Sequence, residues 1–311
     1  MDALAIVFER PEALSLARLA LVEPGAADVV VEVQWTGISS GTERLLWTGR
    51  MPTFPGMGYP LVPGYESVGR IVECGSESGR SVGDLVFVAG SKCFLDARPL
   101  FGGAAERLVV PGARVIPIDN SLQDSGILLA LAATALHAID GGAVPELIIG
   151  HGVLGRLLAR LAVLLGNEPP VVWETNPIRQ HGAIGYRVCT PSDDERRDYK
   201  SIYDVSGDGS LLDSLMARLA PNGEIVLAGF YSDALSFQFA PAFQREARLR
   251  VAAQWQPGDL LAVAKYAAQG SLSFADLISH VQPVADAQSA YRTAFDDASC
   301  LKMVLDWRNC A

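Results

Sequence analysis

The chain has 311 residues, of which 50% are hydrophobic, and carries a formal net charge of −10 with a pI of about 4.9. These values predict a globular protein with room for two cores of ordinary size. The acidity and the lack of a dense Lys/Arg run argue against a nucleic-acid surface or charge-driven docking on anionic lipid. The longest nearly uncharged apolar stretch, residues 126–139, is shorter than the roughly 20 residues that span a bilayer. No signal-peptide pattern opens the chain, so we expect a cytoplasmic protein.

Cysteine usage points to the same compartment. The five cysteines are odd in number and scattered, and no two form a CxxC pair. Free thiols in a reducing environment fit this pattern, and a structural zinc site does not. The five are Cys74, Cys93, Cys189, Cys300 and Cys310.

The first 119 residues predict a compact β-rich domain. Short β-type runs are broken by Gly and Pro, as in DVVVEVQWTG, PLVPGYESVGRIVECG, VGDLVFVAG and AERLVVPGARVIPI. Such spacing is typical of irregular strands joined by tight turns. A helical pattern then covers residues 121–140.

The segment ELIIGHGVLG carries the strongest single motif. A short apolar run enters a turn with Gly150, Gly152 and Gly155, and leaves into the helical pattern RLLARLAVLL. In a dinucleotide site these glycines allow the tight turn, the approach of a pyrophosphate and close helix–strand packing. Free N–H groups at the helix start would then meet the phosphates, so residues 150–155, including His151, Val153 and Leu154, are expected cofactor contacts. An ordinary strand-to-helix turn gives the same three glycines.

The following apolar run, PPVVWE, supports the nucleotide interpretation. It ends at Glu174, 24 positions after Gly150, close to the spacing of a carboxylate that accepts the ribose hydroxyls. A carboxylate there would repel a 2′-phosphate and favours NAD over NADP. Arg179 keeps the NADP alternative open, and a solvated loop acid is the other interpretation of Glu174.

Beyond the turn, apolar strands alternate with amphipathic stretches. The strand candidates are ELIIG, PVVWE, residues 186–189, SIYDVSG and EIVLAGF, the last after a turn at PNG. This alternation predicts a parallel sheet with right-handed crossovers. Helical patterns over residues 257–269 and 284–295 precede a terminal strand in LKMVLDW.

The order of these motifs, from WTGISSGTE through GHGVLG and DVSG to LKMVL, resembles a medium-chain dehydrogenase/reductase over essentially the whole chain. The resemblance implies an α/β fold in which a Rossmann dinucleotide-binding domain (141–253) is inserted in a β-rich GroES-like catalytic domain (1–140 and 254–311). It also implies a nicotinamide cofactor, with Ser206 of DVSG among its contacts. Relatives commonly form homodimers through edge strands, and EIVLAGFYSDALSFQF is a candidate edge.

The chain departs from the zinc-dependent members of that superfamily. Ser40, Tyr65 and Ala130 stand where those members have the Cys, His and Cys ligands of a catalytic zinc. Without a thiolate or imidazole at these positions, we expect no catalytic metal.

Within the superfamily, the short chain with SSGTE and GYE resembles the branch that oxidises bacteriochlorophyllides. This implies NAD-linked oxidation of the C3 1-hydroxyethyl group of a chlorophyllide-type tetrapyrrole to an acetyl group. A zinc-free NADPH-dependent quinone or enoyl reductase and a non-catalytic nucleotide-binding protein remain alternatives. Cofactor preference distinguishes the first alternative, and turnover of any substrate the second.

Hydroxyl groups are the catalytic candidates where the metal site would have been. Thr42 matches the family's proton-relay hydroxyl, and the alternative is a strand-end Thr that bonds its own backbone. Ser40, with Ser39 beside it in uncertain register, is a second donor to the substrate oxygen. Tyr65 is either a phenolic donor or an aromatic filling the emptied metal cavity. Glu43 and Glu66 match carboxylates with a structural role.

A wide apolar surface is needed for a flat tetrapyrrole, with a cation for its propionate. The Pro/Gly-rich loop 48–60 and its flank supply Trp47, Phe54 and Tyr59, with Met51 and Met57, and Arg50 as the cation. The alternative is a dimer-contact or surface-covering loop. His137 is expected to be a packed, hydrogen-bonded residue, and His181 and His280 are assigned no role.

Overall fold

The computed structural model describes residues 1–166 and 168–310, and the chain forms two compact units. The first unit consists of Met1–Ala130 and Phe274–Ala311, and the second, Leu131–Ser273, is inserted between its two parts. Most of helix α2 (Leu129–Asp140) and all of α6 (Pro257–Ala268) belong to the second unit. The functional boundaries after residues 140 and 253 stay a prediction. Within the described residues, no helix is long and apolar enough to cross a membrane.

Two β-sheets form the first unit. In its described residues the larger sheet has the order β16-β17-β3-β5-β6-β9, with β8 also paired to β3, and the smaller has the order β2-β1-β4-β7. The strands are β1 (Asp2–Arg10), β2 (Ala13–Ala20), β3 (Asp28–Ile38), β4 (Leu61–Val62), β5 (Ser67–Cys74), β6 (Leu85–Val88), β7 (Arg98–Pro99), β8 (Arg107–Pro111), β9 (Val115–Pro117), β16 (His280–Pro283) and β17 (Met303–Asp306). The expected β-rich domain is confirmed, and the hairpin β1–β2 is an addition to it.

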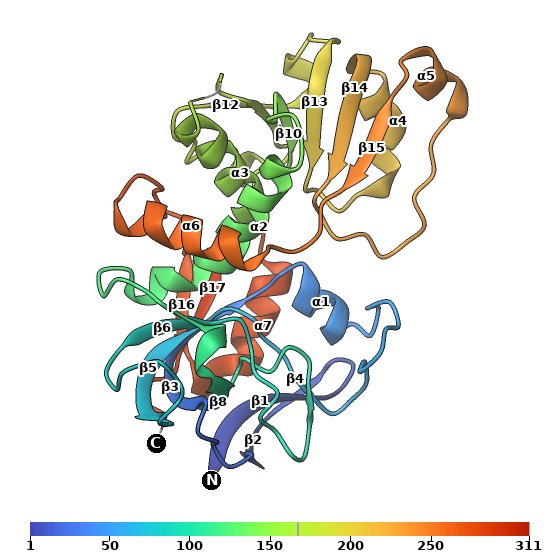
Figure 1. Cartoon of the computed structure of the whole chain (residues 1–311). Coiled ribbons are helices and arrows are strands. Elements are labelled where there is room, and N and C mark those ends of the chain that lie inside the picture. Colours follow the sequence, from blue (N-terminus) through green and yellow to red (C-terminus); the bar gives the residue numbers. More distant parts are fainter. Residues whose placement is uncertain (167, 311) are drawn as a thin grey trace. The chain divides into compact units, whose positions relative to one another are not determined.

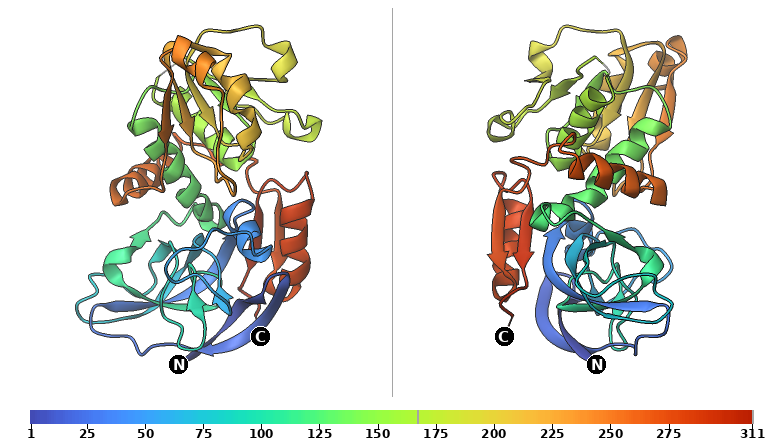
Figure 2. Two further views of the ribbon diagram at one scale, coloured as in Figure 1. Left: turned by 90° about the vertical axis from the view of Figure 1, so that its right-hand side faces the viewer. Right: turned by 60° about the vertical axis from the view of Figure 1, so that its left-hand side comes forward.

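The C-terminal segment completes this unit. Strand β17 pairs antiparallel with β3, from Met303 opposite Ile38 to Asp306 opposite Trp35. Figure 2 shows β16, β17 and helix α7 (Ala287–Asp296) together in the red part of the chain. Their buried side chains join those of the N-terminal strands in one apolar core. Residues 265 to 271 positions apart along the sequence therefore pair in one sheet.

The second unit is built on one parallel sheet. In the described residues its order is β12-β11-β10-β13-β14-β15, and every neighbouring pair is parallel. The strands are β10 (Leu147–Ile149), β11 (Val171–Trp173), β12 (Arg187–Cys189), β13 (Tyr199–Asp204), β14 (Leu219–Leu227) and β15 (Arg248–Val251); Figure 1 shows the last three side by side. The strand order reverses between β10 and β13, and ligands of such sheets bind at the carboxyl ends of the strands at that point.

The expected helices are present, the helix Thr42–Trp47 was not expected, and two of the expected patterns begin with a 3-10 helix, one of them Val284–Asp286 before α7. They are α1 (Thr42–Trp47), α2, α3 (Val153–Leu164), α4 (Leu212–Met216), α5 (Phe239–Gln244), α6 and α7. The pattern over residues 121–140 gives a 3-10 helix, Gln123–Leu128, before α2, rather than one continuous α-helix. Gly126 in that segment lowers its α-helical propensity.

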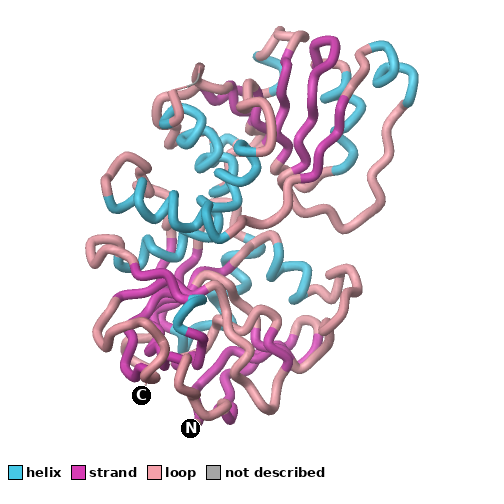
Figure 3. The backbone as a smooth tube through the Cα atoms, viewed as in Figure 1, coloured by secondary structure: helices cyan, strands magenta, loops and turns pink. Residues whose placement is uncertain are grey.

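Two strand predictions are corrected by the sheet. PNG lies inside β14 instead of preceding it, and the pairing with β13 shifts register there, beside Asn222 with a φ of 61°. β14 is also not an edge, because β15 pairs with its other side. The residues after it form a long connection to α5, drawn as loop in Figure 3. On this side the sheet ends at β15, and its opposite edge is β12.

Candidate functional site

The glycine turn has the geometry that a dinucleotide site needs. Gly150 has a φ of +103°, which favours glycine, and a Cβ on Gly155 would lie 2.0 Å from the Gly150 carbonyl oxygen. A Cβ on Gly152 would meet nothing within 4 Å, so this face of the turn is open. Val153 and Leu154 begin α3, where the first amides of a helix have no intrahelical acceptor. Gly150 and Gly155 therefore meet the geometric demands of the motif, and the approach of a pyrophosphate at Gly152 stays a prediction.

Glu174 lies just beyond the carboxyl end of β11 and contacts the same turn. Its Oε2 accepts a hydrogen bond of 3.0 Å from the backbone N–H of His151, and its Oε1 accepts one of 2.8 Å from Asn176. Each carboxylate oxygen keeps further acceptor capacity, because it has two lone pairs. The carboxylate is thus held next to the glycine turn rather than free in solvent.

His151 is fully buried inside the turn, and both of its ring nitrogens are engaged within the protein. Nδ1 donates to the carbonyl of Arg179 over 2.6 Å, and Nε2 lies 2.8 Å from the hydroxyl of Tyr186. Burial is the main cause that lowers the pKa of His151 to about 4, so the imidazole is neutral at physiological pH. We expected His151 to contact a cofactor through its backbone or its ring. Because both ring nitrogens are hydrogen-bonded within the protein, the ring has no free nitrogen for such a contact.

Ser206 follows the central strand β13. Its N–H and its hydroxyl both donate to Oδ1 of buried Asp204, over 2.9 and 2.6 Å. A Cβ on Gly150 would lie 3.6 Å from the Ser206 backbone. The segment after β13 therefore lies against the glycine turn at the point where the strand order reverses.

In the first unit, three hydroxyl side chains meet. Oγ of Ser39 lies 2.8 Å from the phenol oxygen of Tyr65 and accepts a longer bond, 3.4 Å, from the backbone N–H of Thr42. Burial holds the pKa of Tyr65 far above its usual value, although hydrogen bonds with the Ser39 and Thr42 side chains oppose this shift. Tyr65 is therefore a protonated phenol at physiological pH, and its hydroxyl can donate a hydrogen bond.

Thr42 begins helix α1, so the alternative of a strand-end threonine is wrong. The chain leaves β3 at Ile38 and turns into α1 over Ser39–Gly41. Ser40 is exposed in this turn, whereas Ser39 is buried. This turn brings Ser39, and not Ser40, to the Tyr65 hydroxyl.

Two buried glutamates, Glu43 and Glu66, lie near these hydroxyl groups. Oε1 of Glu43 accepts from the Ser39 N–H over 3.0 Å, and its Oε2 accepts from the Tyr291 hydroxyl over 2.7 Å. Burial raises the pKa of Glu43 to about 7, against the lowering effect of both hydrogen bonds. Because Glu43 holds the Ser39 backbone, its role is the structural one expected from the sequence.

Glu66 forms a buried ion pair with Lys302, whose Nζ also donates to the Ile38 carbonyl over 3.1 Å. Burial raises the pKa of Glu66, and the Lys302 ammonium partly offsets this. Gly37 makes room for the pair, since a Cβ there would lie 2.2 Å from Oε2 of Glu66. The pair fixes β17 against the end of β3, directly before Ser39.

Lys302 and Tyr291 were not among the predicted site residues, whereas Ser39 was a candidate beside Ser40 whose register was left open. A lysine inside the apolar run LKMVL was the available signal for Lys302, because a charge in a buried strand requires a partner. Nothing in the sequence indicated that Tyr291 meets Glu43.

The aromatic loop packs mainly on the core of its own unit. The Trp47 ring contacts Phe8 edge-to-face with centroids 5.5 Å apart, and lies 6.4 Å from Phe295. Phe54 and Tyr59 are half-buried against the same core, and the Tyr59 hydroxyl donates to the Leu46 carbonyl. Arg50 is exposed. Of the expected substrate contacts, Trp47 thus has the clearest packing role.

His137 has the structural role that the sequence favoured. Its Nδ1 lies 3.0 Å from Oδ2 of Asp259, which also caps α6 by accepting from the Gln256 N–H. This links α2 to the start of α6 within the second unit.

The donor set at the former metal positions does not fit zinc. Ser40, Tyr65 and Ala130 offer a hydroxyl, a protonated phenol and a methyl group, whereas zinc sites use thiolate, imidazole or carboxylate ligands. Among the described residues, no group of three or more His, Cys, Asp or Glu side chains is arranged to hold a metal ion.

Comparisons with known proteins show which proteins share this architecture. Residues 25–120 match the family model of the alcohol dehydrogenase GroES-like domain. The chain is 55% identical over 315 aligned residues to 2-desacetyl-2-hydroxyethyl bacteriochlorophyllide A dehydrogenase of Cereibacter sphaeroides, covering 99% of both chains. It is 52% identical over 312 aligned residues to the enzyme of the same name from Rhodobacter capsulatus, again covering 99% of both.

Solved structures share the fold at low sequence identity. L-idonate 5-dehydrogenase from Escherichia coli has a TM-score of 0.86 at 18% identity, with 98% of both chains covered. A zinc-binding dehydrogenase from Sinorhizobium meliloti, solved with NADP, has a TM-score of 0.82 at 20% identity, covering 98% of this chain and 99% of that one. An alcohol dehydrogenase from Escherichia coli, solved with NADH, gives the same TM-score and identity, also with 98% of this chain and 99% of that one covered.

The inserted parallel-sheet unit, its glycine turn and the GroES-like unit define a medium-chain dehydrogenase/reductase. Within that superfamily the chain belongs to the bacteriochlorophyllide A dehydrogenase family.

Proposed function

We propose that the protein oxidises the C3 1-hydroxyethyl group of a chlorophyllide-type tetrapyrrole to an acetyl group, with NAD as acceptor and without catalytic zinc. The observation that carries this proposal is 52–55% identity over nearly the full chain to enzymes named for that substrate. It favours a dehydrogenase over the quinone or enoyl reductase and over a non-catalytic nucleotide-binding protein.

The reaction removes a hydride from the carbinol carbon and a proton from its oxygen. When bound, NAD accepts the hydride. In the first unit, Tyr65, Ser39 and Thr42 supply hydroxyl groups, and we assign to them the binding of the alcohol oxygen. With its raised pKa, Tyr65 donates a hydrogen bond to that oxygen, and Thr42 would relay the departing proton toward the cofactor ribose and on to water. Ser40 retains a secondary role at the exposed end of the same turn.

The second unit holds the cofactor in this proposal. The open face at Gly152 and the first amides of α3 receive the pyrophosphate, and Glu174 accepts the adenosine ribose hydroxyls. Solved relatives carry NADP in one case and NADH in another, so the choice of NAD depends on Glu174. Replacing it with Gln removes the charge that would repel a 2′-phosphate.

The E174Q variant tests this choice. We expect its kcat/KM ratio for NAD over NADP to fall by about tenfold, equivalent to ~1.4 kcal/mol. Asp208 is a suitable control, because it is an exposed loop acid that caps only Ser210, and D208N should keep the ratio. An unchanged ratio in E174Q would contradict the assignment of Glu174 to the ribose.

The substrate and metal proposals are tested together with metal-stripped protein. Turnover of 3-hydroxyethyl bacteriochlorophyllide with NAD should continue in the presence of a chelator. Activity that disappears on stripping and returns with added zinc would overturn the zinc-free mechanism. Trp47, Arg50, Phe54 and Tyr59 remain the proposed macrocycle contacts, although the structural role of Trp47 makes Arg50 the cleaner variant.

We also infer a homodimer joined through strand β15. Leu249 and Val251 on this edge are 39% and 76% exposed, and Phe239 and Phe243 on the neighbouring α5 are 73% and 69% exposed. An exposed edge strand with apolar side chains is a template for pairing with a second chain. The free cysteines fit a cytoplasmic location.

A further inference from the structure

Arg156 is a buried cation on α3, at the second turn of the helix that follows the glycine turn. It is 5% exposed, and within the described residues no ion pair joins it to a carboxylate. Its hydrogen bonds all end on backbone carbonyl oxygens, at distances of 2.7–3.3 Å: those of His151, Arg179, His181 and Gly182. Burial lowers the pKa of this guanidinium.

These carbonyls belong to two separate segments. The His151 carbonyl lies in the glycine turn, whereas the other three lie in the loop 179–182, which begins at the last residue of the 3-10 helix Pro177–Arg179 beyond Glu174. One guanidinium therefore ties the turn to the loop. The fit is close, because a Cβ on Gly182 would lie 2.3 Å from an Arg156 nitrogen.

The His151 side chain also connects the glycine turn to this loop. The Arg179 carbonyl is only an acceptor, so Nδ1 of His151 carries the proton and donates to it over 2.6 Å. Nε2 then accepts from the Tyr186 hydroxyl over 2.8 Å. The Arg179 carbonyl thus receives hydrogen bonds from both His151 and Arg156.

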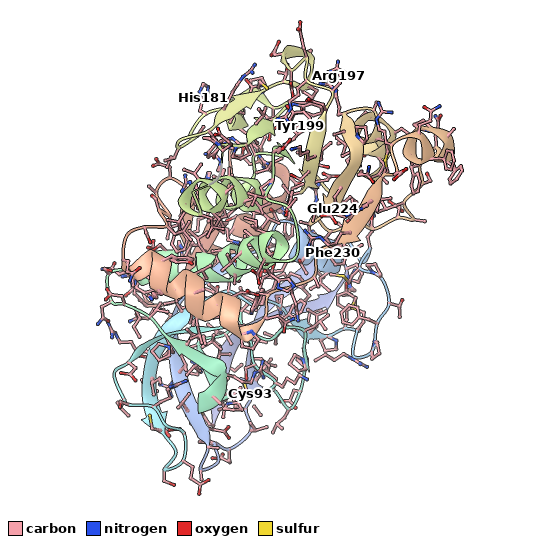
Figure 4. The ribbon with its side chains drawn as sticks, turned by 45° about the horizontal axis from the view of Figure 1, so that its top comes forward. Cys93, His181, Arg197, Tyr199, Glu224 and Phe230 are labelled. Atoms are coloured by element: carbon pink, nitrogen blue, oxygen red, sulfur yellow. The ribbon has the colours of Figure 1, made fainter. Side chains whose placement is uncertain are left out.

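The two linked segments correspond to those that bind neighbouring parts of a dinucleotide. In sheets of this kind the glycine turn holds the pyrophosphate, and the residues at the end of the second strand hold the ribose of the adenosine. The distance between the glycine turn and the loop must therefore match the distance between the pyrophosphate and the ribose of the ligand. Figure 4 labels His181 on the loop, at the periphery of the second unit.

We propose that Arg156 and His151 are positioning residues, which hold the loop 179–182 at the distance from the glycine turn that the cofactor requires. They set the affinity for the adenosine diphosphate part of the cofactor and take no part in hydride transfer. This inference rests on the proposed nicotinamide-dinucleotide function. It adds two residues whose side chains bind the protein rather than the ligand.

The molecule supplies a matched control. Arg218 also binds only backbone carbonyls of a loop, those of Pro191, Asp194 and Arg196, and stacks on Trp173 with its guanidinium carbon 4.7 Å from the ring centroid. Those carbonyls are not in the glycine turn or in the loop after Glu174. R218M should therefore lower the melting temperature without changing cofactor affinity.

The test is the binding of ADP-ribose and NAD to the full chain, measured by calorimetry, together with steady-state kinetics. For R156M we expect both Kd values and the KM for NAD to rise at least about tenfold, while kcat at saturating NAD stays within about twofold. R156K keeps the charge but loses the planar fork, so it should still bind several-fold more weakly than wild type. H151F, which removes both ring hydrogen bonds, should act in the same direction.

Wild-type affinity in folded R156M or R156K would overturn the proposal, as would a fall in kcat with no change in KM. An equal loss of affinity in R218M would show a general effect of stability and would also overturn it. ADP-ribose binding needs no substrate. Wild-type protein that fails to bind ADP-ribose would refute the proposed function itself, whereas binding that is insensitive to Arg156 would refute only this inference.

Discussion

The hydroxyl of Ser39 lies 2.8 Å from the phenol oxygen of Tyr65, and the Ser39 backbone N–H donates a hydrogen bond to the Glu43 carboxyl group. Tyr65 stands at the position where the resemblance to zinc-dependent dehydrogenases implies a histidine ligand. The chain thus presents a pair of neutral, hydrogen-bonded hydroxyls at that position. A group that stays protonated can orient the alcohol oxygen and stabilise charge on it, but it cannot remove the proton by itself.

Removing the Tyr65 hydroxyl should slow the chemical step. We expect Y65F to lower kcat by about a hundredfold, the lower end of the contribution of a positioned acid/base group, with the KM for NAD unchanged. Y203F is the control, because Tyr203 is a buried tyrosine of the second unit whose hydroxyl binds the Ala138 and Ala143 carbonyls. It should reduce stability and keep kcat. Wild-type turnover in Y65F would leave Tyr65 as an aromatic that only fills space.

The ion pair between Lys302 and Glu66 should act as a unit. K302M leaves the Glu66 carboxylate buried without its partner, and we expect a loss of about 3–5 kcal/mol in the free energy of unfolding. Adding E66Q to K302M should recover part of this loss, because the uncompensated charge is then gone. Denaturant titration of wild type, both single variants and the double variant measures the coupling. Additive effects would contradict a direct pair.

Glu43 should make stability depend on pH. Burial raises its pKa from 4.5 to about 7 in the folded protein, so the folded state keeps this proton to higher pH than the unfolded chain. Its contribution to stability is full below pH 4.5 and is lost as the pH rises through 7. E43Q cannot ionise, so relative to wild type its free energy of unfolding should rise by up to about 3 kcal/mol between pH 4.5 and 8. A pH-independent difference between the two proteins would show that Glu43 does not titrate in this range.

The dimer proposal predicts that V251K dissociates the protein. A lysine on the edge strand β15 opposes pairing with a second strand, and Val251 is 76% exposed in the single chain. V281K is the matched control, because Val281 is 51% exposed on β16, an edge strand of the first unit. Sedimentation should give a monomer for V251K and a dimer for V281K. Wild-type protein that is already monomeric would refute the proposal.

The elements that depend on local sequence pattern could be predicted from the sequence. The glycine turn, the parallel alternation and helices α3, α6 and α7 follow from spacing and periodicity along short segments. The terminal strand β17 and the β-rich first unit were also predictable. Strand β15 was missed, because a short exposed edge strand with the alternation RLRV carries a weak apolar signal.

Contacts between distant residues explain what could not be predicted in the site. Tyr291 meets Glu43 across 248 positions, and Lys302 reaches the Ile38 carbonyl across 264. No local pattern encodes such pairs. The choice between Ser39 and Ser40 depended on where β3 ends and α1 begins, and helix boundaries are the least certain feature of a sequence pattern.

Transfer of hydrogen from the hydroxyethyl carbon to the nicotinamide is the central claim, and isotope labelling tests it directly. Metal-stripped protein would be incubated with NAD and 3-(1-hydroxyethyl) bacteriochlorophyllide deuterated at the carbinol carbon, and both products would be analysed by mass spectrometry. The account predicts an acetyl product together with NADH that carries the deuterium. A reduced cofactor without deuterium, or no acetyl product from folded protein that binds NAD, would contradict it.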